Sequence, residues 1–536
     1  MFHKYKLEIF KISEVFIMRK CGILVHPSSF PSKYGIGDIA YGKKFVDFLN
    51  KSGQKLWQIL PLGHTGFGDS PYQSFSTFAG NPLLISPDLL IEDELLNKKD
   101  IENIPNFNSK KVEYGKVIDY KYGLYKKAFL KFDLKDKKYI NFCNKNKFWL
   151  DDYALFMACK NFFIKSRKNT YESREYKIYY STASKFMSDN AVKDCFYGGA
   201  WNSFPKGLRD REKSALYEYS KKLVDDISFY KFIQYEFNKQ WLDLKVYANK
   251  NDIEIVGDIP IFVASDSSDT WSRKELFYIN TKGFTTKVAG VPPDYFSEFG
   301  QLWGNPLYNW KNHKAENYNW WIKRTENVLN LVDIVRIDHF RGFESYWSVP
   351  MGEKTAVNGK WNKGPNREVF DAIKNKLGEL DIIAEDLGDL NDEVIKLRKG
   401  LNFPGMKILQ FAFNDSGNDY LPHNYDSNNY VVYTGTHDND TTIGWYSEQS
   451  DKNKDYIRRY MNISGDSINW DLIRLAISSN AKYCIIPIQD VIGLGSGARM
   501  NMPGVADGNW QFRFSENDLT ENMAETLNYF CKLFNR

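Results

Sequence analysis

The chain has 536 residues, and 43% of them are hydrophobic, a share that supports a large core and excludes wholesale disorder. Its 72 basic and 67 acidic residues leave a net charge of only +5, which excludes the strongly basic balance of a nucleic-acid binder. The length allows three or four domains, but a single α/β barrel with insertions also reaches this size.

The N-terminus, residues 1–18, mixes charged side chains into its apolar ones, whereas the core of a secretory signal is uncharged. We therefore expect an extension without a signal peptide, and either Met1 or Met18 is the true start. No run of residues approaches the length of a membrane span. The six cysteines lack CxxC or CxxxC spacing, which predicts reduced thiols in the cytoplasm and neither a zinc site nor a disulfide framework.

Eight short apolar runs have the pattern of buried parallel strands. In chain order they are Cys21–Pro27, Leu56–Leu62, Ile253–Ala264, Asp333–Phe340, Asp381–Leu387, Met406–Phe413, Tyr430–Asp438 and Tyr483–Asp490. Helical patterns lie between several of them, for example at Lys43–Ser52 and Glu368–Leu377. The alternation predicts an α/β fold, a (β/α)8 barrel of the TIM class. An open doubly wound sheet is the alternative, but it usually has fewer strands and a Gly-rich phosphate loop after the first, which this sequence lacks.

The spacing of these strands is uneven. About 190 residues separate the second strand from the third, far more than a βαβ crossover requires. We therefore predict a barrel over residues 19–536 with large insertions, mainly an inserted helical subdomain at about 91–250 that follows a Gly-, Ser- and Pro-rich loop at Gly63–Leu90. Strand three is expected to reach strand four through only a loop and a helix. No separate all-β domain is expected after strand eight.

Acidic side chains gather at the predicted C-terminal ends of the strands, where barrel enzymes carry their active sites. No Ser-His-Asp or Cys-His arrangement is visible there. The set suits either a divalent metal or glycoside chemistry, in which one carboxylate attacks the anomeric carbon and another protonates the leaving oxygen. Its members are Asp258, Arg336, Asp338, His339, Glu385, Asp386, His437, Asp438, Asp440 and Asp490.

Arg336 favours glycoside chemistry. It precedes Asp338 by two residues on a strand, so the two side chains point to the same face. A fixed positive charge favours the ionised form of a neighbouring carboxylate, which suits a nucleophile and opposes metal binding. A cap or a surface ion pair is the ordinary alternative for any single acid. For Asp338, Glu385 and Asp438 together, each at a strand end, we favour the catalytic interpretation.

Eight segments make the sequence resemble a known family from about Cys21 to Phe514. The chain resembles the 4-α-glucanotransferases of the α-amylase clan, called amylomaltases in bacteria and disproportionating enzymes in plants. The motifs RIDHF and HDN alone would indicate only the wider clan, whereas the segments at Gly63–Asn81 and Ala289–Trp310 indicate the transferases. The eight segments are CGILVHPSSFPSKYGIGD, LWQILPLGHTGFGDSPYQSFSTFAGNPLLIS, VGDIPIFVASDSSDTW, AGVPPDYFSEFGQLWGNPLYNW, VRIDHFRGFESYW, IIAEDLG, YTGTHDNDTTIGW and ARMNMPGVADGNWQFRF.

The resemblance implies roles for particular residues. Asp338 corresponds to the nucleophile, Glu385 to the general acid/base and Asp438 to a third carboxylate that holds sugar hydroxyls. The segment Ala289–Gly304 corresponds to a flexible lid over the acceptor side. The implied substrate-binding residues are Ser70, Tyr72, Asp258, Trp303, Arg336, His437 and Asn501.

The implied reaction is retaining transfer of an α-1,4-glucan segment from a maltooligosaccharide to the 4-hydroxyl of glucose or another glucan, with no cofactor and no metal. The implied partners are maltooligosaccharides, starch- or glycogen-derived glucans and glucose, with no nucleic acid and no membrane. We expect a cytoplasmic monomer. A hydrolase of the same clan is the nearest alternative, although α-amylases usually add a calcium-binding domain and an all-β C-terminal domain. A non-catalytic glucan-binding protein is the alternative of another class.

Overall fold

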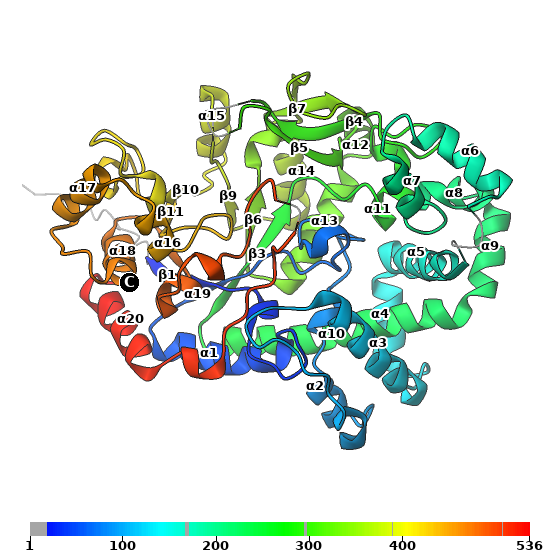
Figure 1. The fold of residues 1–536 in the computed structure, drawn as a ribbon, viewed down its shortest axis with the longest axis horizontal. Coiled ribbons are helices and arrows are strands. Elements are labelled where there is room, and N and C mark those ends of the chain that lie inside the picture. The colour runs from blue at the N-terminus through cyan, green and yellow to red at the C-terminus, as the bar shows by residue number, and fades with distance from the viewer. Residues whose placement is uncertain (1–18, 167–170, 294–296, 389, 506) are drawn as a thin grey trace, which may run out of the picture.

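Eight parallel strands form the centre of the molecule (Figure 1). The computed structural model describes residues 19–166, 171–293, 297–388, 390–505 and 507–536, so the predicted extension at residues 1–18 lies outside the described residues. The sheet has the order β10-β11-β12-β1-β2-β3-β6-β9. Its strands are β1 Lys20–Leu24, β2 Leu56–Gln58, β3 Glu254–Pro260, β6 Ile334–Asp338, β9 Ile382–Ala384, β10 Gly405–Ile408, β11 Tyr430–Tyr433 and β12 Tyr483–Pro487.

The two ends of this sheet meet. The backbone N–H of Ala384, at the end of β9, donates a 2.9 Å hydrogen bond to the carbonyl of Pro404, the residue before β10. Sheet closure leaves no open edge, so the predicted (β/α)8 barrel is confirmed. Each strand is shorter than its predicted run. The run Ile253–Ala264, for example, leaves the ladder after Pro260, because the residues that follow turn away into the loops at the barrel mouth.

Helices surround the barrel as the alternating pattern predicts. The predicted helix Lys43–Ser52 is confirmed as α1 and Glu368–Leu377 as α14, whose apolar positions face the strands. The link from β10 to β11, which is described throughout, contains 3-10 turns and no α-helix. The helices that connect or follow barrel strands are α1 Gly42–Lys51, α10 Val224–Lys250, α13 Asn319–Leu331, α14 Arg367–Leu377, α15 Asp392–Gly400, α16 Thr442–Ser447, α17 Asp451–Met461, α18 Ile468–Ser478, α19 Ile488–Ile492 and α20 Glu521–Leu533.

The long segment between β2 and β3 is helical. Its last helix, α10, packs against β3 and α1 on one side and against α3, α4 and α5 on the other. Large side chains such as Phe237 and Trp241 are buried along α10, so one helix is shared by the barrel and the inserted helices. The other helices of this segment are α2 Pro87–Glu92, α3 Tyr114–Lys131, α4 Lys137–Lys145, α5 Lys147–Ser166, α6 Arg174–Ala183, α7 Asp189–Cys195, α8 Lys206–Arg209 and α9 Lys213–Lys222.

The connection from β3 to β6 corrects the sequence prediction. The expectation of only a loop and a helix was wrong, because this connection also contains two strands of a second, four-stranded sheet with the order β5-β4-β7-β8. Its strands are antiparallel and lie at the top of Figure 1. They are β4 Lys287–Val291, β5 Gln301–Pro306, β7 Ser345–Pro350 and β8 Lys360–Lys363, and the same connection holds α11 Ser268–Ser272 and α12 Trp310–Ala315.

This small sheet was missed because its strands pair across long stretches of chain. The predicted lid Ala289–Gly304 is mostly the β4–β5 hairpin, not a plain loop, and its tip at 294–296 lies outside the described residues. Gly and Pro near the tip have the composition of a loop and mask the strand pattern on either side. The described residues after β12 form helices and turns.

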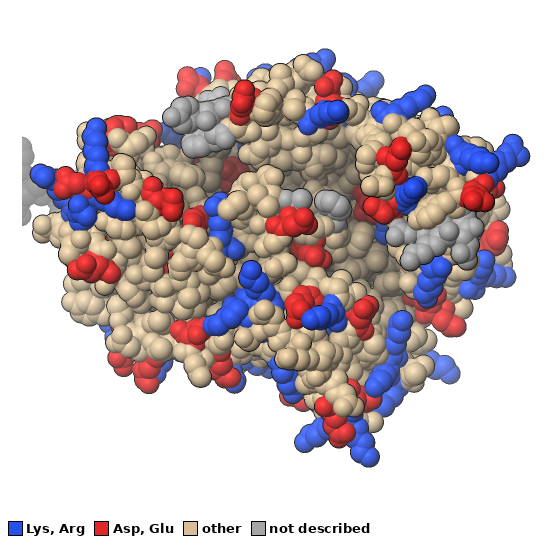
Figure 2. Space-filling view, in the orientation of Figure 1, with Lys and Arg blue, Asp and Glu red and all other residues tan. Residues whose placement is uncertain are grey.

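The surface carries charges of both signs. Figure 2 shows Lys and Arg interspersed with Asp and Glu over the visible face, in keeping with the small net charge. Within the described part of the chain, no helix is both long and apolar enough to cross a membrane.

Candidate active site

A row of charged side chains crosses neighbouring strands at the C-terminal end of the barrel. Asp258 on β3 pairs in register with Arg336 on β6. The guanidinium of Arg336 donates from Nη1 to Oδ2 of Asp258 at 2.5 Å and from Nη2 to Oδ1 of Asp338 at 2.9 Å. Arg336 and Asp258 are buried, whereas the Asp338 side chain is 30% exposed at the barrel mouth. The partly exposed carboxylate of Asp338 is therefore held in place by the buried guanidinium of Arg336.

Burial and charge act in opposite directions within this row. Burial lowers the pKa of Arg336, but the charges of Asp258 and Asp338 raise it by more, so it stands well above its usual value. Burial raises the pKa of Asp258 to about 6 in spite of the neighbouring Arg336. Arg336 thus stays positive, and its guanidinium lies in hydrogen-bond contact with Asp338.

Glu385 lies in an environment that raises the pKa of its carboxyl group. It follows β9, and its side chain accepts hydrogen bonds from the backbone N–H of His339 at 2.6 Å and of Leu387 at 2.9 Å. Burial raises the pKa of Glu385 to about 8, and the negative charge of Asp338 contributes to the rise, whereas Arg336 and the two N–H donors oppose it. A carboxyl group with a raised pKa therefore lies at the same mouth as a carboxyl group that a buried arginine contacts, an arrangement that suits acid/base and nucleophilic roles.

Asp438 is the most exposed of the three acids, at 46% of its side chain. Asn501 donates from Nδ2 to its Oδ1 at 2.6 Å, and Nε2 of His437 lies 3.3 Å from the same oxygen. Arg499 donates to the backbone carbonyl of Asp438 at 2.5 Å and to that of Asn501 at 2.8 Å. The loop after β12 therefore holds the third acid and the sequence-predicted residue Asn501 together.

Tyr72 links residues from two sides of this mouth, Asp258 on β3 and His437 after β11. Its hydroxyl donates to Oδ2 of Asp258 at 2.8 Å, and its ring stacks on His437 with centroids 5.3 Å apart. The preceding loop is folded tightly, because the backbone N–H of Tyr72 donates to the Ser70 hydroxyl at 3.2 Å and antiparallel bridges join Gly63 to Gly80 and Thr65 to Ser74. Ser70 thereby shapes the turn that presents Tyr72.

Trp303 approaches the site from β5. Its ring lies 4.8 Å from that of His339 in an edge-to-face arrangement and 6.4 Å from that of Phe262. The inner face of the small sheet is in this way attached to the residue next to Asp338. All ten residues predicted from the sequence therefore lie on the loops and strand ends around the barrel mouth.

Three neighbouring residues were given no role from the sequence, although His339 belonged to the strand-end set. His339 adopts a left-handed backbone with φ of 53°, which aims its N–H at Glu385, and burial lowers the pKa of its imidazole to about 3. The ring of Trp510 lies 5.6 Å from that of Tyr72 and 6.0 Å from that of His437. Arg499 and Trp510 both lie in the segment ARMNMPGVADGNWQFRF, which also contains Asn501 and carries the family resemblance. The resemblance could therefore have identified them.

Other strand-end acids are used by the fold. Asp386 forms an ion pair with Arg398 at 2.8 Å and accepts from the N–H of Met406 at 2.7 Å. Asp490 is buried and accepts from Thr434 and Thr442. These two acids stabilise connections between neighbouring strands and loops. Among the described residues, no group of three or more His, Cys, Asp or Glu is arranged to hold a metal ion.

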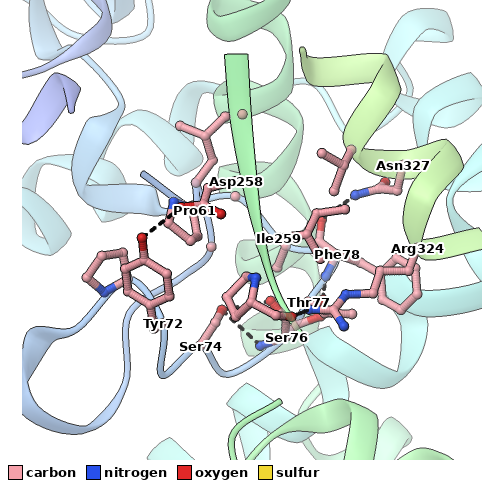
Figure 3. A pocket seen from close by; sticks show the side chains of 18 of the residues that line it. Pro61, Tyr72, Ser74, Ser76, Thr77, Phe78, Asp258, Ile259, Arg324 and Asn327 are labelled. Carbon is pink, nitrogen blue, oxygen red and sulfur yellow. Dashed lines mark hydrogen bonds between the residues drawn. The ribbon is translucent and has the colours of Figure 1, made fainter. Parts of the chain in front are cut away.

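A cavity of about 690 Å³, including space open to solvent, adjoins the site (Figure 3). It lies between the Gly63–Gly80 loop, β3 and α13, and Tyr72 and Asp258, which are hydrogen-bonded to each other, form part of its wall. Most of its lining is apolar, and Arg324 and Asn327 come from α13. The three acids do not line it, so the cavity backs the site and is not the catalytic cleft.

Replacing Asp258 by Asn is expected to lower the free energy of unfolding by about 3 kcal/mol, because the change leaves the buried Arg336 charge with one anionic partner fewer. Urea unfolding followed by circular dichroism measures this change. The matched control is Glu254→Gln, on the same strand, whose ion pair with Lys20 is partly exposed. We expect the control to cost less than about 1 kcal/mol. Equal effects of both changes would contradict the importance of the buried pair.

The sequence was compared with protein families and with known proteins. It matches the family described as 4-alpha-glucanotransferase over residues 25–520. A 4-alpha-glucanotransferase of Clostridium butyricum is 46% identical over 520 residues, which cover 96% of this chain and 100% of that protein. One of Synechocystis sp. is 44% identical over 529 residues and covers 97% of this chain and 98% of its own.

A solved structure agrees with these relatives. The amylomaltase of Streptococcus agalactiae, in complex with acarbose, superposes with a TM-score of 0.87 at 37% identity and covers 97% of this chain and 99% of its own. The amylomaltase of Corynebacterium glutamicum has a TM-score of 0.71 at 15% identity, covering 96% of this chain and 75% of its own, which supports the fold alone.

Proposed function

The chain belongs to the 4-alpha-glucanotransferase family, and on that premise we propose that Asp338, Glu385 and Asp438 transfer α-1,4-glucan segments at the barrel mouth. The family membership carries the activity, and the predicted transferase function is confirmed at that level. The observation that supports the residue roles is the contrast between Asp338, beside the buried cation of Arg336, and Glu385, whose pKa is raised to about 8.

The first half-reaction uses both acids. The protonated carboxyl of Glu385 gives its proton to the glycosidic oxygen while a carboxylate oxygen of Asp338 attacks the anomeric carbon. The carbon–oxygen bond to the leaving chain breaks, and that chain departs with a free 4-hydroxyl. The product is a covalent glucosyl ester on Asp338, which is the intermediate of a retaining reaction.

The second half-reaction reverses these steps with a new acceptor. The carboxylate of Glu385 takes the proton of an incoming 4-hydroxyl, the oxygen attacks the anomeric carbon, and Asp338 leaves. A glucan acceptor remakes an α-1,4 bond, whereas water would hydrolyse the intermediate. The bond formed is equivalent to the bond broken, so the enzyme's task is to keep water out, and we propose that the β4–β5 hairpin with Trp303 does this.

The remaining side chains bind and orient the sugar in this proposal. Asp438 and His437 bind sugar hydroxyls, with Asn501 holding Asp438 in position. Tyr72 offers a ring over the site, and Arg336 and Asp258 keep the nucleophile in place. We propose maltooligosaccharides as donors and glucose or another glucan as the acceptor. We also propose that the protein is a cytoplasmic monomer.

Incubation with maltotriose tests the activity. Transfer converts it into glucose and a ladder of chains longer than the donor, which chromatography separates. A hydrolase of the same clan would yield only shorter products, and a non-catalytic glucan-binding protein would leave maltotriose unchanged. Absence of products longer than maltotriose would contradict the proposal.

The rate is expected to fall as pH rises through about 8. The reason is that the general acid must be protonated, and Glu385 loses its proton in the free protein near this pH. The measurement is kcat/KM for maltotriose between pH 6 and 10. An α-maltotriosyl fluoride donor provides the control, because fluoride leaves without a proton and its kcat/KM should stay flat over the same range. An alkaline decline of equal size for both donors would contradict the assignment of Glu385.

A further inference from the structure

The outer face of the small sheet carries a group of apolar side chains that the catalytic proposal does not use. We call Phe299, Leu302, Trp347, Val357 and Trp361 the outer patch. Four of them are exposed: Phe299 by 57%, Val357 by 48%, Trp361 by 40% and Leu302 by 38%. Large apolar side chains grouped at a surface often mark a binding site.

The strand register brings three of these side chains to one face. Leu302 on β5 and Trp347 on β7 both lie opposite Gly290 on β4, and Trp361 on β8 lies opposite Trp347. Directly opposed residues of antiparallel strands point to the same side of a sheet. Phe299 and Val357 join them through Ala356, which donates its N–H to the carbonyl of Phe299 at 3.0 Å and accepts from the Trp347 indole at 2.8 Å.

Two neighbouring side chains fix the orientation of the Trp361 indole ring. The guanidinium of Arg341 lies 4.1 Å from the centre of its ring, and Trp347 meets the ring edge to face at 5.3 Å. Both neighbours fix the orientation of the indole while part of it stays exposed. Gly359 permits the close packing beside it, since a Cβ atom there would lie 2.1 Å from the Trp347 indole nitrogen. A fixed ring costs little conformational entropy when a ligand stacks on it.

The residues around the outer patch share two chain segments with residues of the catalytic site. Arg341 lies in the 3-10 turn Phe340–Phe343, which directly follows Asp338 and His339. Leu302 on the outer face is adjacent in β5 to Trp303, whose ring packs on His339. The outer patch therefore lies on the opposite face of the small sheet from Trp303 and is linked to the site through β5 and the Phe340–Phe343 turn.

We propose that the outer patch binds a segment of a long α-glucan, outside the cleft that holds the reacting bond. This inference rests on the proposed transfer of glucans. Its chemistry fits a sugar, because the apolar face of a pyranose stacks on an indole while its hydroxyls reach a nearby amide, here that of Asn358 beside Val357. Such a site retains a long donor or acceptor between successive transfers.

The test uses titration of maltoheptaose by calorimetry, in protein that carries Asp338→Asn so that the ligand is not consumed. We expect two sites per chain in this background. Adding Trp361→Ala should remove one of them or weaken it about 10-fold, whereas Trp361→Phe, which keeps a ring, should retain most of the binding. The matched control is Tyr217→Ala on α9, another exposed aromatic side chain with a cation, Lys221, over its ring; both sites should persist in it.

An unchanged second site in the Trp361→Ala protein would overturn the proposal. If this variant does not fold, Phe299→Ala replaces it, since that side chain is largely exposed and contributes little to packing. A second copy of this chain is the other possible ligand of the outer patch, and sedimentation of the same variants tests it. An altered oligomeric state without a change in maltoheptaose binding would also overturn the glucan proposal. The maltotriose ladder of the unsubstituted protein tests the transfer activity separately, so failure of either proposal is recognised on its own.

Discussion

Replacing Asp338 by Asn is expected to lower glucan transfer by at least about 10⁴-fold, because the amide cannot form the covalent glucosyl intermediate. The fold should persist. The amide oxygen can still accept the hydrogen bond that Arg336 donates at 2.9 Å, and the side chain lies at the edge of the core with 30% of its surface exposed. Initial rates of maltotriose disproportionation and the circular dichroism spectrum measure the two halves of this expectation.

The matched control for this change is Asp426→Asn. Asp426 pairs with Lys399 and Tyr430 at the opposite end of the barrel, where the same loss of a charge should leave transfer intact. An α-maltotriosyl fluoride donor sharpens the test: Asp338→Asn should release no fluoride beyond the background rate, since a good leaving group cannot replace the nucleophile. Unchanged maltotriose disproportionation by the Asp338→Asn protein would contradict the assignment of Asp338 as the nucleophile.

Replacing Glu385 by Gln is expected to lower transfer from maltotriose by about 10²–10⁴-fold, because the leaving oxygen loses its proton donor. The loss of activity in Glu385→Gln should depend on the leaving group of the donor, whereas the loss in Asp338→Asn should not. Fluoride needs no proton to leave, so the Gln variant should still form the glucosyl intermediate from α-maltotriosyl fluoride. The second half-reaction lacks its base, and the intermediate should accumulate.

Mass spectrometry of the intact Glu385→Gln protein, quenched after mixing with the fluoride, measures this accumulation. A mass increase equal to a maltotriosyl group, located on the peptide that contains Asp338, is the expected result. Loss of fluoride release equal to that of Asp338→Asn would show that Glu385 is not the acid/base. The backbone N–H groups of His339 and Leu387 donate to different oxygens of Glu385, so glutamine keeps one of these two hydrogen bonds through its single amide oxygen.

The sequence by itself determined the barrel and the three acids. Parallel strands buried on both faces are continuous apolar runs, and eight such runs lie in β1, β2, β3, β6, β9, β10, β11 and β12. Asp338 ends β6, Glu385 directly follows β9 and Asp438 lies on the loop after β11, and the C-terminal ends of barrel strands meet at one mouth. Local pattern was sufficient here because burial along a strand is a property of consecutive residues.

Only the tertiary structure decided which side chains act on one another. The small sheet pairs β4 with β7, and no local pattern between Gly290 and Trp347 encodes that register. Tyr72 reaches Asp258 across 186 residues of chain, and Asn501 reaches Asp438 across 63. Asp386 and Glu385 are adjacent in sequence, yet the first stabilises a connection through Arg398 while the second faces the mouth. The raised pKa of Glu385 likewise arises from burial and from the charge of Asp338, and both depend on where folding brings distant segments together, not on the order of residues within one of them.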